Sequence, residues 1–124
     1  MIWTTKLHKS WSPIEIARAK RMLCIMQDYF GLHDSIIEVH FKKANKDYYG
    51  LTEKCGKHHV LITLYKNKEI KSTVVHEMTH AKQFIRKELG YQLQWKRSKK
   101  WQNAPYYEQP WEKEAIKMEA LFSK

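Results

Sequence analysis

The chain has little cysteine and no long apolar run, and both absences narrow the class of protein. Its two cysteines, Cys24 and Cys55, are too few and too far apart for a disulfide framework. No apolar stretch approaches the roughly 18 residues of a membrane-spanning helix. The first residues, Met1 to Lys6, lack the apolar core of a signal peptide. The sequence therefore predicts one intracellular, cytoplasmic domain over residues 1–124, without a membrane partner.

Acidic residues are scarce as well. The chain has 13 Asp and Glu against 23 Lys and Arg, which gives a formal net charge of +10. Part of this charge lies in a short segment that also carries tryptophans, and such a mixture suits phosphate contacts and base stacking. The same segment also fits a solvated loop on a basic protein. The candidate nucleic-acid contacts are Trp95, Arg97, Lys99, Lys100 and Trp101.

An HExxH motif is present in the middle of the chain, as His76-Glu77-Met78-Thr79-His80. On a helix, residues four apart lie on one face, one turn from each other, so both imidazoles can bind a single zinc ion. Glu77 then lies beside the metal, where it can take a proton from a bound water. The motif predicts one Zn²⁺ per chain.

Apolar residues around the motif follow the period of an amphipathic helix. This helix is expected from about Lys68 to Leu89, and the following Gly90 is typical of a left-handed helix end. His76 and His80 fall almost opposite the apolar stripe, which favours a metal site over buried core histidines. The stripe consists of Ile70, Val74, Met78, Ala81, Ile85 and Leu89.

A third zinc ligand is needed, because catalytic zinc usually takes three protein ligands and a water. No histidine, cysteine or aspartate follows His80, so only glutamates remain downstream. Proline at position 110 followed by acidic residues is typical of a first helical turn, so a second helix is expected to supply the ligand. The downstream candidates are Glu88, Glu108, Glu112, Glu114 and Glu119.

The stretch Glu112-Lys113-Glu114-Ala115 is similar to the ExEA and ExxA patterns of small gluzincin metallopeptidases. From the HExxH motif onwards the chain resembles this group, which includes ImmA/IrrE-like peptidases of bacteria and mobile elements. SprT-like peptidases are similar in size but carry a downstream histidine. The resemblance implies that His76 and His80 bind zinc, that Glu77 is the general base, and that Glu112 is the third ligand, with Glu114 as the alternative. It also makes a phage or plasmid origin an expectation.

One departure from the gluzincin pattern concerns the residue that orients a zinc-bound histidine. Gluzincins often place an acidic or amide residue four positions after the third ligand, but Ile116 and Met118 occupy these positions after Glu112 and Glu114. The orienting group must therefore come from elsewhere. Glu119 shares a helix face with Glu112 and is the candidate.

The remaining segments predict an α+β fold with the layout of a minimal zincin. A capping box at residues 12–15 begins an N-terminal helix that ends before Gly31. Residues 36–41 and 59–65 are expected as strands of a small antiparallel sheet, with another short strand or turn near Gly50. A long loop over residues 91–108 leads to the C-terminal glutamate helix, from about Pro110 to Phe122.

Together these features predict zinc-dependent hydrolysis of a peptide bond in a protein or peptide substrate. Zinc activates a water molecule and Glu77 accepts its proton. A hydrogen-bond donor is also needed for the developing oxyanion, and Tyr106, Tyr107 and Arg97 in the long loop are the candidates. Two alternatives fit the same sequence. One is a basic nucleic-acid-binding module with an accidental or degenerate HExxH motif, and the other is a zinc hydrolase acting on a non-peptide bond.

Overall fold

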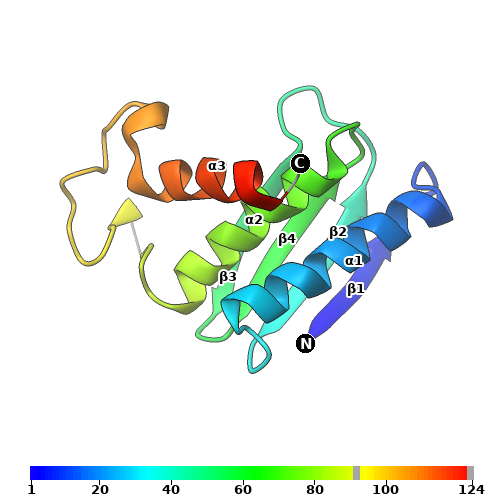
Figure 1. Ribbon diagram of the computed structural model, residues 1–124, viewed down its shortest axis with the longest axis horizontal. Coiled ribbons are helices and arrows are strands. Elements are labelled where there is room, and N and C mark those ends of the chain that lie inside the picture. Colours follow the sequence, from blue (N-terminus) through cyan, green and yellow to red (C-terminus); the bar gives the residue numbers. More distant parts are fainter. Residues whose placement is uncertain (91–92, 123–124) are drawn as a thin grey trace.

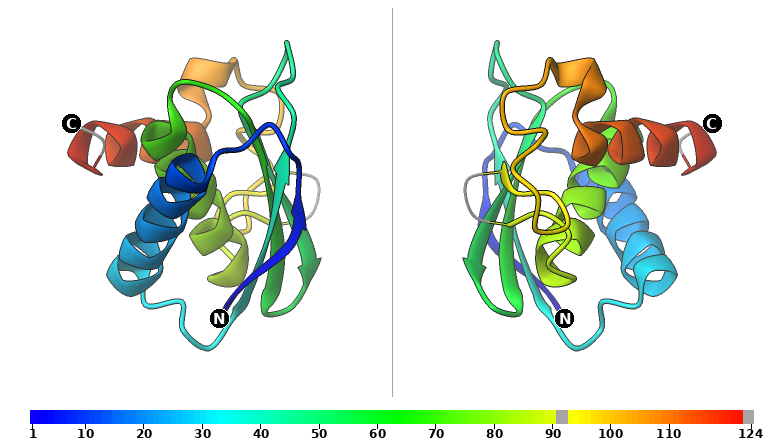
Figure 2. Two further views of the ribbon diagram at one scale, coloured as in Figure 1. Left: turned by 90° about the vertical axis from the view of Figure 1, so that its right-hand side faces the viewer. Right: turned by 90° about the vertical axis from the view of Figure 1, so that its left-hand side faces the viewer.

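The chain forms a four-stranded sheet with three α-helices on one of its faces (Figures 1 and 2). The computed structural model describes residues 1–90 and 93–122. The predicted α+β class is confirmed. No helix in these residues is both long and apolar enough to cross a membrane. The elements are β1 (Ile2–Leu7), α1 (Pro13–Phe30), β2 (Ile36–Lys42), β3 (Gly50–Gly56), β4 (His59–Tyr65), α2 (Ile70–Ile85), the short 3-10 helix η2 (Tyr106–Glu108) and α3 (Pro110–Phe122).

The sheet is mixed, so the prediction of an antiparallel sheet was wrong. Its strand order is β1-β2-β4-β3, in which β1, β2 and β4 are parallel and only β3 runs antiparallel to its neighbour. The parallel pairing of β1 with β2 is possible because α1 connects them as a crossover. The strands β3 and β4 form a hairpin at the other edge. Strand β1 was not predicted from the sequence, and only a short strand or turn was predicted in the region of β3.

The hydrophobic core lies between the sheet and the helices α1 and α2. Alternate residues of β2 and β4 point towards the helices and are fully buried, as expected for strands with one covered face. The buried side of α2 carries the predicted apolar stripe, so the two histidines are left on the other side of the helix. Core residues with no or almost no exposure include Ile37, Val39, Phe41, Val60, Ile62, Leu64, Leu23, Met26, Val74, Met78 and Ala81.

The predicted boundaries of α1 are confirmed by its two caps. Ser12 accepts a hydrogen bond from the Glu15 amide, and the Glu15 carboxylate accepts one from the Ser12 amide, which completes the capping box. At the other end Gly31 has a φ of 66°, the left-handed conformation that glycine adopts without strain.

Helix α2 is shorter than predicted at both ends. It begins at Ile70 and ends at Ile85, although a helix to Leu89 closed by Gly90 was expected. The chain turns earlier because Lys87 takes a left-handed φ of 60°, and the amides of Glu88 and Leu89 then bond to the carbonyl of Gln83. Leu89 becomes buried in this turn, with 3% of its surface exposed. The predicted loop follows, with residues 91 and 92 outside the described residues.

The cap of α1 gives a test of the fold. Replacing Ser12 by Ala removes one capping hydrogen bond, and we expect the free energy of unfolding to fall by about 1 kcal/mol. Ser12→Asp is the matched control, because its carboxylate can accept the same hydrogen bond and should retain most of the stability. Equal stability of Ser12→Ala and the unaltered protein in urea denaturation would contradict the assigned role of the cap.

Candidate metal centre

The two histidines of the motif meet on the side of α2 that faces α3 and the cleft. His76 and His80 lie one turn apart, and their Nε2 atoms are 3.1 Å from each other. Their rings meet edge to face, with centroids 4.7 Å apart. Val74, Met78 and Ala81 hold the opposite side of the helix in the core and are fully buried. The apolar stripe therefore fixes the direction in which both imidazoles point.

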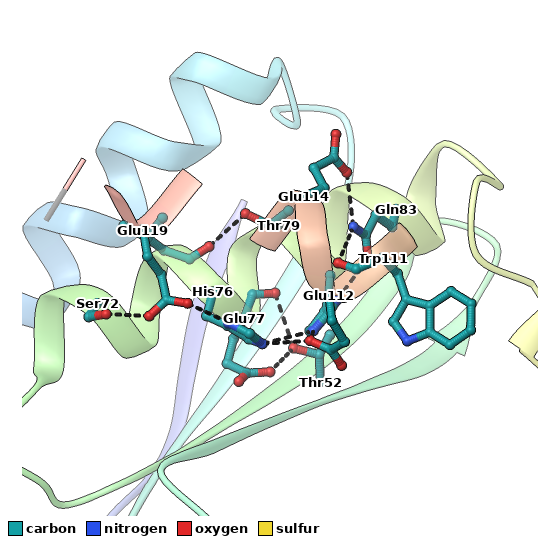
Figure 3. A network of polar contacts seen from close by, with 12 residues as sticks. Thr52, Ser72, His76, Glu77, Thr79, Gln83, Trp111, Glu112, Glu114 and Glu119 are labelled. Carbon is teal, nitrogen blue, oxygen red and sulfur yellow. Dashed lines mark hydrogen bonds and ion pairs between the residues drawn. The ribbon is translucent and has the colours of Figure 1, made fainter. Parts of the chain in front are cut away.

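Helix α3 brings a carboxylate to the same point (Figure 3). The Oε1 atom of Glu112 lies 2.9 Å from His76 Nε2 and 3.0 Å from His80 Nε2. One ligand atom from each of these three residues lies within 4.8 Å of the other two, so the group could hold a metal ion. Trp111 and Ala115 anchor α3, since both are buried. The predicted site residues His76, His80 and Glu112 are thus brought together.

The Nδ1 atom of His76 is bound on the far side of its ring by Glu119. The distance from His76 Nδ1 to Glu119 Oε2 is 2.8 Å, and Ser72 donates a hydrogen bond to the other carboxylate oxygen. Glu119 is the carboxylate that the sequence analysis proposed for this role. It lies two turns after Glu112 on α3, which explains why the four-residue spacing of the gluzincin pattern does not find it.

His80 is oriented by a chain of three buried or half-buried polar residues. Its Nδ1 atom lies 2.8 Å from Gln83 Oε1, and the Gln83 amide donates to Glu114 Oε1 at 2.9 Å. Lys82 in turn donates to both oxygens of Glu114, at 2.7 and 2.8 Å. Glu114 therefore contacts Lys82 and Gln83 and reaches His80 only indirectly, through Gln83. It does not extend to the point where His76, His80 and Glu112 meet.

Gln83 and Lys82 were not identified from the sequence. The available signal was the position of Gln83, three residues after His80 and therefore on a neighbouring part of the same helix surface. Its amide also donates to the carbonyl of Trp111 at 2.9 Å, which ties α2 to α3. Because Gln83 is fully buried, each of these hydrogen bonds is needed to offset the cost of removing its amide from water.

The hydrogen bonds at the Nδ1 atoms of His76 and His80 suit these residues for binding a metal ion through Nε2. Glu119 and Gln83 each present an oxygen to an Nδ1 atom, so each imidazole keeps a proton there. If a cation were bound, both Nε2 lone pairs would be free to face it, together with Glu112 Oε1. Outer contacts of this kind, from a carboxylate or an amide, are typical of metal-binding histidines.

The imidazoles of His76 and His80 and the carboxylate of Glu112 shift one another's pKa values. Burial acts against protonation of His76, but its hydrogen bonds with Glu112 and Glu119 outweigh this effect and raise its pKa to about 10. Burial also acts against ionisation of Glu112, but hydrogen bonds from His76 and His80 outweigh it and lower its pKa to about 2. Protons on the imidazoles thus occupy the place that a cation would take.

Glu77 lies next to this group and is almost fully buried, with 7% of its surface exposed. Burial raises the pKa of its carboxyl group, although the two nearby histidines act in the opposite direction. Thr52 of β3 donates a 2.7 Å hydrogen bond to Glu77 Oε1. Gly50 leaves room for the same side chain, because a Cβ atom there would lie 2.8 Å from Glu77 Cγ. The edge strand β3 therefore positions Glu77.

These residues line an open cleft of about 660 Å³ between β3, α2 and α3. Tyr106 lines it as well, and burial, the charge of Glu112 and a hydrogen bond with Glu112 raise its pKa to about 12. The other two candidate oxyanion donors lie elsewhere. Tyr107 is 79% exposed and does not line the cleft, whereas Arg97 lines a second cavity.

In the basic loop, residues 95–101, both tryptophans have a lysine near the ring. Trp95 packs beside Trp111, with ring centroids 6.3 Å apart, and Lys96 lies 5.5 Å above the Trp95 ring. Lys100 covers Trp101 at 4.8 Å. Arg97, Lys99 and Lys100 remain exposed cations, as predicted for this segment.

Comparison of the chain with protein-family models, curated proteins and solved structures gives no match. The gluzincin resemblance therefore has only the residues of this chain as its support.

The choice between Glu112 and Glu114 can be tested through metal affinity. Glu112→Ala removes an atom that touches both imidazoles, and we expect the zinc affinity to fall by more than about 100-fold, since outer contacts alone are worth about 10- to 100-fold. Glu114→Ala acts only through Gln83 and should cost about tenfold. A competition titration against a chromogenic chelator measures both values.

Glu108→Ala, in the exposed part of η2, is the control for that titration and should leave the affinity unchanged. A larger loss for Glu114→Ala than for Glu112→Ala would overturn the ligand assignment.

Proposed function

We propose that the protein is a zinc-dependent peptidase of the gluzincin type, with one Zn²⁺ held by His76, His80 and Glu112. The observation that carries the proposal is the approach of Glu112 Oε1 to both Nε2 atoms, at 2.9 and 3.0 Å, from a separate helix. Two histidines and one glutamate are a set of ligands that catalytic zinc uses, with a further position open to solvent.

The ligand types favour zinc over other common cations. Imidazole nitrogens suit zinc and related transition metals, whereas magnesium and calcium prefer sites made of oxygen alone. Among these transition metals, zinc has no redox chemistry and acts as a Lewis acid that polarises carbonyl groups. A zinc ion at this site would supply a Lewis acid for the substrate carbonyl and would lower the pKa of water.

The chain's own residues supply the proton transfers of the proposed reaction. Glu77 would accept a proton from the attacking water and deliver it to the leaving amine, a role for which a raised pKa is suitable. Thr52 holds one oxygen of Glu77 and so fixes the direction of its carboxylate. Tyr106 stays protonated at neutral pH and is the candidate donor to the oxyanion.

The cleft also suits an extended peptide. Gly50, Leu51 and Thr52 of β3 line it, and within the part of the chain that the structure describes β3 is an edge strand paired with β4 alone. A substrate backbone could add to this edge through main-chain hydrogen bonds, which depend little on the side chains of the substrate. This edge favours a peptide over a small molecule with a non-peptide bond.

The accidental-motif alternative is less well supported. An HExxH sequence that arose by chance would not require a carboxylate from α3 beside the two rings, nor oxygen acceptors on both Nδ1 atoms.

As for location, Cys24 and Cys55 are both free and exposed, which suits the reducing cytoplasm.

Glu77→Gln tests the proposed base. The amide keeps the size of the side chain but cannot accept the proton, so we expect cleavage of unfolded, fluorophore-quenched casein to fall by at least the ~100-fold typical of general-base catalysis. Zinc content should stay at one per chain. Glu53→Gln, on the outer side of β3, is the control and should keep full activity. Unchanged turnover by zinc-loaded Glu77→Gln would show that another group is the base.

A further inference from the structure

A second cavity of about 640 Å³ adjoins the cleft and is lined mainly by cations. Three separate parts of the chain contribute them: β3, the turn after α2 and the basic loop. We refer to this space as the basic cavity. Its five cationic residues are Lys54, Arg86, Lys87, Lys96 and Arg97.

The charge of the basic cavity is not neutralised from within. Glu88 is the one acidic residue that lines it, and its carboxylate pairs with the buried Lys82 at 2.7 Å. In the described residues, 1–90 and 93–122, no carboxylate forms an ion pair with Lys54, Lys87 or Arg97. Of the other two cations, Arg86 donates a hydrogen bond to the carbonyl of Phe30 and Lys96 lies over the Trp95 ring. The positive charge available to a ligand therefore comes mainly from Lys54, Lys87 and Arg97.

The cleft carries the opposite charge. Among the described residues, no lysine or arginine lines it, although the whole chain has a net charge of +10. Glu77, Glu112 and Glu119 belong to the metal centre, but Asp47 and Glu69 also line the cleft near the start of α2. The cations lie past the other end of α2, where Arg86 and Lys87 follow its last residue.

The walls of the cleft continue into the basic cavity. Leu89 lines both spaces. On β3, Thr52 contacts Glu77, and Lys54 is two residues further on, so both side chains lie on the same face of the strand about 7 Å apart. Helix α2 follows the same course, from Glu77 to the turn at Arg86 (Figure 1). A peptide lying along β3 in the cleft would reach the basic cavity within a few residues.

We propose that the basic cavity binds acidic side chains of the substrate on one side of the scissile bond. This inference rests on the proposed peptidase function and specifies its substrate class: peptides with Asp or Glu about two to four residues from the cleaved bond, given the rise of about 3.3 Å per residue in an extended chain. Acidic residues on the other side meet Asp47 and Glu69 and are disfavoured. The expected preference is thus one-sided.

A nucleic acid would meet the same cations, but the geometry favours a peptide. Trp95 packs beside Trp111, and one lysine lies over a face of each of Trp95 and Trp101, which reduces the surface left for base stacking. A phosphate backbone that continued from the cavity along the cleft would meet the carboxylates that line the cleft, whereas an extended peptide can carry neutral residues there.

The first test is a cleavage profile on a mixed-sequence peptide library, read by mass spectrometry. The unaltered enzyme should give products with Asp and Glu enriched on one side of the cleaved bond and depleted on the other. The variant Lys54→Gln/Lys87→Gln/Arg97→Gln should lose this enrichment and cleave neutral peptides as before. An identical acidic preference in this variant would overturn the proposal.

A matched control separates local contacts from the overall charge. Lys9→Gln/Lys20→Gln/Arg21→Gln removes the same number of lysines and arginines from exposed positions on and before α1 that line neither space. It should keep the acidic preference. Loss of the preference in both triple variants would mean that the general field of the protein is responsible, and would overturn the basic cavity as a binding site.

The second test needs no turnover and so distinguishes failure of this inference from failure of the peptidase proposal. Zinc-loaded Glu77→Gln is titrated with a fluorescein-labelled peptide that contains four consecutive glutamates, and binding is followed by anisotropy. Adding the three cavity substitutions should weaken binding roughly tenfold, as exposed ion pairs contribute modestly. The control substitutions should change it by less than about threefold.

The outcomes of the binding test are distinct. Cavity-dependent binding of the acidic peptide without any cleavage by the unaltered, zinc-loaded protein would support the basic cavity and reject the peptidase. Tighter, equally cavity-dependent binding of an oligo-dT strand would overturn the acidic-peptide assignment in favour of nucleic acid. Lys54→Glu, a single exposed reversal in β3, serves as a second variant if the triple variant loses thermal stability, and it should abolish the preference for acidic peptides.

Discussion

The contact of one carboxylate oxygen with two imidazoles organises this protein. Glu112 Oε1 lies 2.9 Å from His76 Nε2 and 3.0 Å from His80 Nε2, and further polar contacts of Ser72, Lys82 and Gln83 join the same two helices. Burial acts against charge on the imidazoles and on the Glu112 carboxylate, but their mutual hydrogen bonds and the one with Glu119 outweigh it, which raises the pKa of His76 to about 10 and lowers the pKa of Glu112 to about 2. The site is therefore built for positive charge at one point.

Each element of the fold contributes to that point. The apolar side of α2 sets the direction of the histidines, and the anchoring of α3 by Trp111 sets the depth of Glu112. The outer contacts are divided between the helices, since Gln83 on α2 reaches α3 and Glu119 on α3 reaches α2. Removing either contact would loosen the packing of the two helices as well as the orientation of a ring. Stability and site geometry are thus coupled.

Charge is distributed very unevenly for a chain with a net charge of +10. Carboxylates gather in the cleft, where a bound cation would balance them, and the cations stay outside it. The buried Lys82 shows the same separation on a small scale. Its ammonium group pairs with Glu88 and Glu114, 2.7 Å away in each case, and so supports Gln83 without entering the cleft. A substrate lying along β3 would pass from the carboxylates of the cleft to the cations of the basic cavity.

Local sequence signals predicted the parts of the structure that depend on local rules. The capping box fixed the start of α1, the branched residues of β4 marked a strand, and the HExxH spacing placed both histidines on one face. Non-local features were missed. The strand β1 is defined by its pairing with β2, and Lys87 ends α2 early because Leu89 turns into the core. Glu112 and Glu114 could not be separated, since the choice depends on how α3 packs against α2.

The central claim is that His76, His80 and Glu112 hold one zinc ion, and the metal content of the purified protein tests it most directly. Elemental analysis after dialysis against trace zinc should give one zinc per chain for the unaltered protein and none for the His76→Ala/His80→Ala variant. Full zinc content in the double variant, or no zinc in the unaltered protein at neutral pH, would contradict the account.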